Sequence, residues 1–420
     1  MKRAMKKSRQ MNGGKKKVSR LKAARTERCS GCGFCESVCN SVGICTGCGA
    51  CVIACPNEAR YLEEHDIAVR EVEICVDGER IAVPEHITLL NALEMAGFRI
   101  FSFKNELKEK EIIAPCRTGG CWACAVIVDG ELMPSCITPV TEGMNVITST
   151  DEPMRTVSGF QGHPVGGVGT PYWVKPRLGA YMPVEVACFA HGCNLRCPTC
   201  QNWRITYSSQ ETPLTPMEAA KLISYERIIN RVDRIAISGG ECTLNRKWLI
   251  SYIKSLKLLN TDERVRIHVD TNTTFLTPDY IDELVHAGMT DIGVDIKARR
   301  VDTFMRISGL NDGEIAEKFL KNAWNALKYL VDEYSDRIFI GVGIPYNSAL
   351  ISRDEIAEIG ERIAAMSDEV QVCALDYRPE FRRIDIKKPN YEEMMRIKEI
   401  LNQCGLKCVI CQTEFGRIGP

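Results

Sequence analysis

The chain has 420 residues and no formal net charge, with 45% hydrophobic and 26% charged side chains, which suits a globular protein of about two to four domains. No stretch approaches the ~18 apolar residues of a membrane helix, and the basic N-terminus lacks the apolar segment of a secretory signal, so we expect a cytoplasmic protein. The 22 cysteines stand in clusters. In a long chain without an export signal, such clusters favour iron–sulfur centres over disulfides and indicate an anaerobic or reducing setting.

Residues 1–28 form a strongly basic segment, with 12 Lys and Arg side chains and one acid, Glu27. Too few of its side chains are apolar for it to fold alone, so we expect a disordered, solvated tail. The alternative is a contact arm for nucleic acid or for an acidic partner. We favour the solvated tail and expect no nucleic-acid partner.

Residues 29–62 carry two copies of the spacing C-x2-C-x2-C-x3-C. This is the pattern of bacterial ferredoxins with two [4Fe–4S] clusters, in which the fourth cysteine of each run binds the other cluster. The segment is too small for a core of its own, so metal must hold it together. Zinc, the alternative, fits these repeats without histidine poorly. The first cluster is assigned to Cys29, Cys32, Cys35 and Cys55, and the second to Cys39, Cys45, Cys48 and Cys51.

Residues 69–150 begin with strand-like runs around Asp77-Gly78, which predict a hairpin, and continue with a helix that ends at Gly97. The spacing C-x4-C-x2-C with a distant fourth cysteine is that of plant-type [2Fe–2S] centres, and zinc is again the alternative. The predicted ligands are Cys116, Cys121, Cys124 and Cys136. The stretch resembles the β-grasp [2Fe–2S] domain of the succinate dehydrogenase iron–sulfur subunit. Residues 151–183 are rich in Gly and Pro and are expected to be a linker.

Residues 184–420 alternate short β-branched runs with amphipathic stretches, which predicts a parallel α/β domain. The predicted strands span 185–190, 234–241, 265–273, 290–298, 337–345 and 370–377, and the predicted helices include 217–230, 247–259, 278–287 and 314–332. Six such units predict a partial (β/α)6 barrel after the two N-terminal modules. Parallel barrels place their chemistry at the C-terminal ends of the strands, where the polar motifs of this chain fall.

The loop after the first of these strands contains Cys193, Cys197 and Cys200 in the spacing C-x3-C-x2-C. A cubane needs four ligands and this loop supplies three, so one iron is left open for a small molecule. The motif resembles that of the radical S-adenosylmethionine superfamily. The resemblance implies that the open iron of a third [4Fe–4S] cluster chelates S-adenosylmethionine. It also implies that one electron cleaves this molecule to methionine and a 5′-deoxyadenosyl radical, which abstracts hydrogen from a substrate.

Polar residues at the following strand ends match further motifs of that superfamily. The resemblance implies that Gly239, Gly240 and Glu241 hold the amino group of S-adenosylmethionine. Four other positions match polar residues of pyruvate formate-lyase activating enzymes and their relatives, and are expected to contact the cofactor. These four are Asp270, Asn272, Asp295 and Lys297. The alternative for such residues is a cap or an ion pair at a strand end.

Cys404, Cys408 and Cys411 repeat the spacing C-x3-C-x2-C near the C-terminus. The surrounding sequence alternates like a buried strand, and free cysteine is an ordinary core residue. We therefore expect core residues there rather than ligands of a fourth cubane. His191 is likewise expected to serve packing or hydrogen bonding.

Two classes of function compete on this sequence. The first is a radical enzyme whose N-terminal centres receive electrons from an external ferredoxin, flavodoxin or oxidoreductase, and the second is a non-catalytic multi-cluster electron carrier. Among enzymes, glycyl-radical enzyme activases are an alternative, but they usually carry their ferredoxin module after the cysteine loop, and residues 201–237 contain no Cys. The stretches GCNLRCPTCQNW and YRPEFRR resemble AmmeMemoRadiSam-type proteins more closely. The substrate does not follow from fold-level analogy.

Overall fold

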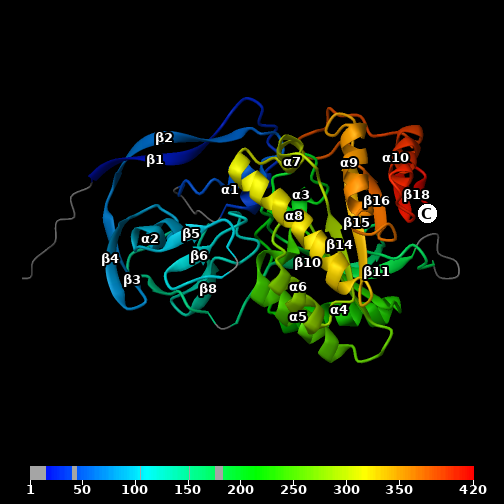
Figure 1. The fold of residues 1–420 in the computed structure, drawn as a ribbon. Helices are drawn as coiled ribbons and strands as arrows, with labels where there is room; N and C mark the ends of the chain where they lie inside the picture. Colours follow the sequence, from blue (N-terminus) through cyan, green and yellow to red (C-terminus); the bar gives the residue numbers. More distant parts are fainter. Residues whose placement is uncertain (1–15, 40–44, 105, 151, 176–182) are drawn as a thin grey trace, which may run out of the picture.

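The computed structural model describes residues 16–39, 45–104, 106–150, 152–175 and 183–420. Figure 1 shows the N-terminal segments, coloured blue to cyan, beside a larger α/β domain coloured green to red. None of the helices in the described ranges is long and apolar enough to cross a membrane.

A nine-stranded sheet forms the centre of the larger domain. Its order is β10 (Val157–Pro164), β11 (Val184–Ala190), β12 (Arg234–Gly239), β13 (Arg266–Thr271), β14 (Asp291–Asp295), β15 (Phe339–Tyr346), β16 (Gln371–Asp376), β17 (Val409–Thr413) and β18 (Gly416–Ile418). Strands β11 to β17 are parallel, whereas β10 and β18 are antiparallel edge strands. The sheet is therefore open rather than a closed barrel.

Helices connect the parallel strands, as the sequence predicts. They are α3 (Trp203–Tyr207), α4 (Pro216–Asn230), α5 (Arg246–Leu259), α6 (Pro278–Ala287), α7 (Val301–Ser308), α8 (Gly313–Tyr334), α9 (Arg353–Ala364) and α10 (Tyr391–Gln403). The six predicted strands and the four predicted helices are all present. The parallel part has one strand more than predicted, because β17 also joins it.

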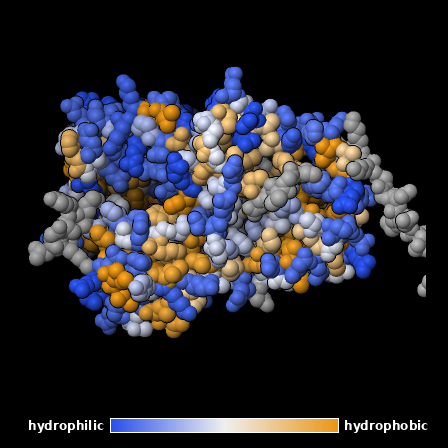
Figure 2. All heavy atoms as spheres, turned by 180° about the vertical axis from the view of Figure 1, so that it is seen from behind, coloured by the Kyte–Doolittle hydropathy of each residue, from blue (hydrophilic) through white to orange (hydrophobic). Residues whose placement is uncertain are grey.

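Local sequence explains where α4 begins. Pro216 occupies the first turn, where its missing N–H costs nothing. Thr215 accepts a hydrogen bond from the backbone N–H of Glu218, and the Glu218 carboxylate accepts one from the backbone of Thr215, which is a capping box. The outer face of α4 exposes Leu222, Tyr225 and Ile228 among others, and Figure 2 shows hydrophobic surface in this region.

The two faces of the sheet differ in character because successive side chains of a strand point to opposite sides. On β13, Ile267 and Val269 are buried in the large core that the helices share. Their neighbours His268 and Asp270 instead line a pocket on the other face. The candidate site therefore lies on the face that the helices do not cover.

The segment with the predicted plant-type quartet contains a five-stranded sheet in the order β4-β3-β9-β7-β8. Asp77 and Gly78, both at positive φ, form the predicted hairpin turn. Gly97 follows the predicted helix at φ 90°. The elements are β3 (Glu71–Val76), β4 (Glu79–Pro84), α2 (Leu89–Met95), β7 (Ala125–Val128), β8 (Glu131–Pro134) and β9 (Asn145–Ile147), with a separate pair β5 (Arg99–Phe101) and β6 (Glu111–Ile113).

The basic segment differs from its expectation where the structure describes it. Residues 16–25 form β1 (Lys16–Arg25), which pairs along its whole length with β2 (Arg60–Val69). Backbone hydrogen bonds to β2 order this segment, and the composition of residues 1–28 gives no sign of that distant partner strand. Residues 1–15, the rest of the predicted disordered tail apart from 26–28, lie outside the described residues.

The expected linker, residues 151–183, also differs. Its residues 157–164 form the edge strand β10, and residues after β10 fill the pocket face of the sheet. There the carbonyls of Gly167 and Thr170 accept hydrogen bonds from Gln371, both at 2.8 Å, and the carbonyl of Gly169 accepts one from Arg234 at 2.8 Å. Glycines suit this position because the sheet approaches so closely that a side chain would not fit. Residues 165–171 are called the plug segment below.

Candidate functional site

Cys193, Cys197 and Cys200 follow β11 and line one pocket of about 360 Å³ at the carboxyl ends of the parallel strands. Burial raises the pKa of all three thiols, while the nearby Lys297 lowers that of Cys197 and Cys200. Thiols of this kind lose their protons when they bind a metal centre. The donor set, three soft sulfur atoms from one short loop, fits one face of an iron–sulfur cubane.

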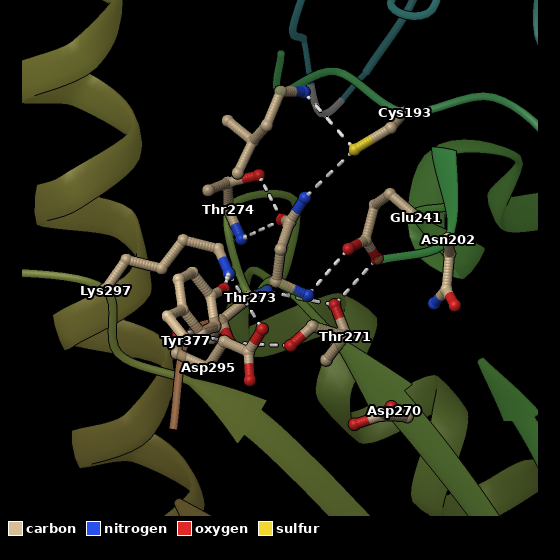
Figure 3. Close-up of polar contacts among 12 residues, drawn as sticks. Cys193, Asn202, Glu241, Asp270, Thr271, Thr273, Thr274, Asp295, Lys297 and Tyr377 are labelled. Atoms are coloured by element: carbon tan, nitrogen blue, oxygen red, sulfur yellow. Dashed lines mark hydrogen bonds and ion pairs between the residues drawn. The ribbon is translucent and has the colours of Figure 1, made fainter. Parts of the chain in front are cut away.

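The pocket gathers most of the residues that the sequence singled out. Asp270 comes from the end of β13, while Asp295 and Lys297 come from the end of β14. Figure 3 shows these side chains together with Cys193 and Glu241. The predicted site residues that line the pocket are Cys193, Cys197, Cys200, Gly239, Gly240, Asp270, Asn272, Asp295 and Lys297. Among the residues predicted to hold the catalytic cluster and S-adenosylmethionine, Glu241 is the one that does not line it.

Gly239 and Gly240 pack against the start of the cysteine loop. A Cβ on Gly239 would lie 2.5 Å from the backbone nitrogen of Ala190, and a Cβ on Gly240 would lie 2.4 Å from the carbonyl oxygen of Gly192. Gly239 also has φ 110°, which disfavours any other residue. The backbone N–H of Gly240 donates to Ala190 at 2.7 Å. Both glycines are therefore needed to seat the cysteine loop, in addition to any contact with a ligand.

Glu241 has a fully buried carboxylate whose hydrogen bonds are made within the protein. One oxygen accepts from the hydroxyls of Thr243 at 2.6 Å and Thr271 at 2.7 Å, and from the N–H of Thr243 at 3.0 Å. The other accepts from the N–H of Asn272 at 2.6 Å. Through these hydrogen bonds Glu241 connects the loop after β12 to the loop after β13, and this connection is called the Glu241 brace below. The expected contact of Glu241 with an amino group stays a prediction.

Asn272 connects the Glu241 brace to the first cysteine. Its side-chain amide donates to Asn194 at 3.0 Å and reaches the Cys193 sulfur at 3.7 Å. Its side-chain oxygen accepts from the hydroxyl of Thr274 at 2.6 Å. Amide hydrogen bonds to a ligating sulfur are a recognised way to tune an iron–sulfur centre.

Lys297 and Asp295 form a buried pair beside the other two cysteines. The ammonium donates to Asp295 at 2.8 Å and to the Tyr377 hydroxyl at 3.4 Å, and Lys297 is only 5% exposed. Burial opposes its charge, but Asp295 and Tyr377 together raise the pKa of Lys297 well above its ordinary value. The ammonium remains charged and can compensate thiolate charge at Cys197 and Cys200.

Asp270 lines the same pocket, and its carboxylate accepts a hydrogen bond from Ser238 at 2.7 Å. Burial raises the pKa of Asp270 to about 6, with Asp295 adding to the effect and His268 opposing it. The His268 ring in turn lies 3.3 Å from the Glu185 carboxylate. Asp270, His268 and Glu185 all line the pocket, so three titratable side chains share this face of the sheet.

Several residues of the site escaped the sequence analysis. Ser238 directly precedes the Gly-Gly-Glu motif and Tyr377 begins the YRPEFRR stretch, but neither side chain was predicted to belong to the site. Arg155 is fully buried and donates to the carbonyls of Cys242 at 2.6 Å and His191 at 3.2 Å. It therefore ties the cysteine loop to the residues after the Gly-Gly-Glu motif, and nothing in the Gly- and Pro-rich context of Arg155 signals this role.

The plant-type quartet forms a compact buried group. The thiol of Cys116 lies within hydrogen-bond reach of Cys121 and Cys136, and Cys136 also reaches Cys124. The surrounding loop has positive φ at Arg117 and other positions, which coils its backbone around the thiols. This donor set fits a [2Fe–2S] centre.

The ferredoxin-type quartets surround η1 (Phe34–Ser37) and α1 (Ala50–Ala54). Burial raises the pKa of Cys48 and Cys51, and the nearby Cys39 and Cys45 raise it further. Cys39 thus lies near the second run although it belongs to the first, which fits the crossed assignment.

Arg60 lies near cysteines of both predicted ferredoxin-type clusters. Its guanidinium donates to Cys35 at 3.0 Å, and the charges of Cys51 and Cys29 also act on it. The Cys55 sulfur accepts from the N–H of Ala59 at 3.3 Å, next to Arg60 in the chain. The crossed assignment of these cysteines therefore stays a prediction.

Cys404, Cys408 and Cys411 do not share a site. Cys411 lies on β17 and donates to the carbonyl of Met394 at 3.2 Å, whereas Cys404 donates to Ala357 at 3.4 Å. Cys408 and Cys411 are buried, as the sequence predicts for core residues, whereas Cys404 is only half-buried. Across the described ranges, no group of three or more His, Cys, Asp or Glu side chains is arranged to hold a single metal ion.

Three family models match the chain. The radical SAM superfamily model matches residues 188–350, the 2Fe-2S iron-sulfur cluster binding domain matches residues 69–151, and a 4Fe-4S binding domain matches residues 42–61. The last match includes the second cysteine run, while the first run lies outside it. The chain therefore carries a radical S-adenosylmethionine domain together with [2Fe–2S] and [4Fe–4S] ferredoxin domains.

Solved structures similar to the chain include three enzymes or maturases. SuiB of Streptococcus suis bound to S-adenosylmethionine is 15% identical with a TM-score of 0.35, over 53% of this chain and 48% of that chain. Coproporphyrinogen III oxidase (HemN) of Escherichia coli is 17% identical with a TM-score of 0.33, over 45% and 44%. HydG, a maturase of the [FeFe]-hydrogenase, is 14% identical with a TM-score of 0.40, over 53% and 50%. The chain thus spans about half the length of these structures or less. The comparison with curated proteins gave no match.

Proposed function

We propose that this chain, which carries a radical S-adenosylmethionine domain beside two kinds of ferredoxin domain, is an enzyme that reductively cleaves S-adenosylmethionine to start hydrogen abstraction from a substrate. Cys193, Cys197 and Cys200 would hold a [4Fe–4S] cluster that supplies one electron to the sulfonium of the bound nucleotide. The observation that carries the proposal is the pocket itself. Among its described lining residues these three thiols stand without a fourth cysteine, so one iron would stay open toward the strand ends.

The residues around the pocket suit the polar end of S-adenosylmethionine. Lys297 uses two of its three donors on Asp295 and Tyr377, and the third is free for a carboxylate. Asp270 offers carboxylate oxygen for an ammonium group. The pocket is bounded by the plug segment, of which Val168 and Gly169 line the cavity. That segment would keep water from the lower end of the pocket during radical chemistry.

The N-terminal modules would serve as the electron supply. We propose three [4Fe–4S] clusters and one [2Fe–2S] cluster for the chain as a whole, held by the cysteines assigned above. An external one-electron donor, a ferredoxin, flavodoxin or oxidoreductase, would reduce them. The ferredoxin-type run exposes Cys32 to solvent, which is where such a donor could approach.

Within the superfamily, we propose a relative of the pyruvate formate-lyase activating enzyme-like and AmmeMemoRadiSam-type proteins. The YRPEFRR stretch supports this because it lies against the cysteine loop: the backbone N–H groups of Arg382 and Arg383 donate to the carbonyl of Pro198 at 3.0 and 3.2 Å. The ferredoxin module precedes the domain rather than following its cysteine loop, which sets the chain apart from glycyl-radical enzyme activases.

Anaerobic reconstitution with iron and sulfide, followed by S-adenosylmethionine and dithionite, tests the proposal. We expect 5′-deoxyadenosine from the wild type and none from Cys197→Ala. Cys404→Ala, which removes a thiol outside the pocket, is the matched control and should retain the product. A reconstituted wild type that neither binds S-adenosylmethionine nor forms this product would overturn the proposal in favour of a multi-cluster electron carrier.

A further inference from the structure

Arg196 stands between the first two cysteines of the catalytic loop and joins that loop to the plant-type quartet. One guanidinium nitrogen donates to the carbonyl of Cys193. The other donates to the carbonyl of Cys116 at 2.8 Å. A single side chain therefore hydrogen-bonds to the backbone of a proposed ligand of each centre. Arg is suited to this because its planar fork presents donors in fixed directions.

Neighbouring contacts fix the same two loops from the other side. Asn245 donates from its side chain to the carbonyl of Cys121 at 3.2 Å, and the loop before Cys193 touches Cys121 through Gly192. The thiols of Cys116 and Cys121 belong to the same buried core as Cys193. The loop that carries Cys116 and Cys121 is thus in direct contact with the catalytic loop.

Arg382 makes an equivalent connection at the opposite end of the catalytic loop. Its backbone N–H donates to the carbonyl of Pro198 at 3.0 Å. Its guanidinium donates to the carbonyls of Cys55 at 3.0 Å and Ile53 at 2.8 Å, where α1 ends. The side chain therefore caps the ferredoxin helix while its backbone holds the loop between Cys197 and Cys200.

Aromatic side chains fill the space around this second connection. Phe34 of the ferredoxin segment contacts Trp203 edge-on with ring centroids 4.7 Å apart, and Trp203 stacks on Phe381 at 5.2 Å. Cys51 and Cys200 pack against the same apolar cluster. The ferredoxin-type module thus approaches Cys200 through its own contacts.

We propose that the catalytic loop 193–200 is a junction where electrons reach the catalytic cluster by two separate routes, one from each N-terminal iron–sulfur module. Arg196 is the positioning residue of the branch from the plant-type module, and Arg382 that of the branch from the ferredoxin-type module. The inference rests on the proposed function and gives its electron supply an order that the sequence alone left open. In each branch, the cluster of the N-terminal module would lose one electron and the catalytic cluster would gain it. An external one-electron reductant then restores the module. Separate arrival follows from the contacts because electron transfer falls steeply with distance and both modules touch the same loop.

Magnetic coupling between centres in the reduced holoprotein tests the junction, with each branch serving as the control of the other. We expect Arg196→Gln to weaken the coupling between the [2Fe–2S] and catalytic signals in electron paramagnetic resonance and to leave the coupling of the ferredoxin-type clusters intact. Arg382→Gln should do the reverse. If the electrons instead pass through the two modules one after the other, only one of the two substitutions should disturb the signal of the catalytic cluster, and that result would overturn the proposal. Unchanged spectra in both variants would overturn it too.

Iron and sulfide content show whether each variant keeps its clusters. If a Gln variant loses a cluster, the corresponding Lys variant, Arg196→Lys or Arg382→Lys, is measured in its place. Lys retains the positive charge of Arg but not its two-pronged geometry, so we expect a partial loss of the same magnetic coupling. Cleavage of S-adenosylmethionine by the wild type tests the proposed function separately from the junction. Reciprocal couplings without cleavage would leave the junction standing and remove the proposed function. Cleavage with unaltered couplings in both variants would remove the junction alone.

Discussion

Gly120 and Gly192 face each other where the plant-type loop meets the catalytic loop. A Cβ on Gly120 would lie 2.7 Å from the backbone nitrogen of Gly192, and a Cβ on Gly192 would lie 2.8 Å from the backbone nitrogen of Cys121. Neither distance leaves room for a methyl group without backbone movement. Two proposed metal-binding loops, distant in sequence, can touch here because both positions are glycine.

Gly120→Ala tests this contact without a conformational complication, because Gly120 has no left-handed φ. We expect the methyl group to push the loops apart and lower the free energy of unfolding by about 1–3 kcal/mol, measured by urea denaturation of the anaerobic holoprotein. Gly166→Ala is the matched control, since a Cβ there meets no atom within 4 Å. Equal stability of both variants would contradict the close contact.

Glu241→Gln distinguishes bracing from ligand binding. A Gln amide cannot accept hydrogen bonds on its nitrogen, so one end of the side chain must face the donors of Thr271 and Thr243 or of Asn272 unsatisfied. We expect a loss of about 1–3 kcal/mol in the free energy of unfolding without any added S-adenosylmethionine.

The control for this prediction is Glu380→Gln, which alters a half-buried carboxylate with a single hydrogen bond from Trp203 at 3.1 Å. A Glu241→Gln protein that unfolds like the wild type, yet binds S-adenosylmethionine more weakly, would instead support the direct contact that the sequence motif predicts.

Strands and site residues with local signals were predictable from the sequence. The hairpin at Asp77-Gly78 and the six parallel strands each carry their own pattern, and so the pocket residues Asp270 and Lys297 fell at the correct strand ends. Glu241 shows the limit of a motif: the sequence places it after β12, but the direction of its side chain depends on donors from Thr271 and Asn272, which belong to the end of β13.

The elements that the sequence missed are ordered by partners far away in the chain. The plug segment has the composition of a linker, and only its contacts with His268, Gln371 and Gly341 reveal its place in the sheet. The strand β1 is rich in Lys and Arg, and backbone pairing with β2 rather than an apolar pattern orders it. Arg196 and Arg382 lie in the motif stretches GCNLRCPTCQNW and YRPEFRR, but their contacts could not be predicted because the carbonyls that they bind lie in other modules.

Asp270 makes stability depend on pH in a direction opposite to that of a salt-bridged carboxylate. Burial raises its pKa to about 6, against ~3.9 in an unfolded chain. Between these values the folded state binds more protons than the unfolded state, so this residue lowers the free energy of unfolding as pH rises, and the loss is complete above about pH 6.

Asp270→Asn removes this titration and can still accept the hydrogen bond from Ser238. We expect the stability of the variant relative to the wild type to increase by about 2–3 kcal/mol between pH 4 and pH 7, measured by urea denaturation at several pH values. A constant difference across this range would show that Asp270 is solvated in the folded protein.

The pair of Asp295 and Lys297 should behave as one unit. Loss of either partner leaves a charge in a pocket with little solvent, since Lys297 is 5% exposed and the Asp295 side chain 24%. In a double-mutant cycle of Asp295→Asn and Lys297→Met, we expect an interaction energy of about 1–3 kcal/mol, with the double variant more stable than the sum of the single effects predicts. Additive single effects, measured by urea denaturation, would contradict a coupled pair.

The plug segment should depend on the glycines that let it lie against the sheet. A Cβ on Gly169 would lie 1.7 Å from the Nε2 atom of His268, and one on Gly341 would lie 1.6 Å from the carbonyl oxygen of Val168. Since backbone lies on one side of each contact, the segment must move away. We expect Gly169→Ala to expose residues 165–171 to limited proteolysis and to lower the free energy of unfolding by at least about 1–3 kcal/mol. Gly166→Ala, in the same segment but with open space around its Cβ, should remain as protected as the wild type, and equal protection of Gly169→Ala would show that the segment does not fill the pocket face of the sheet.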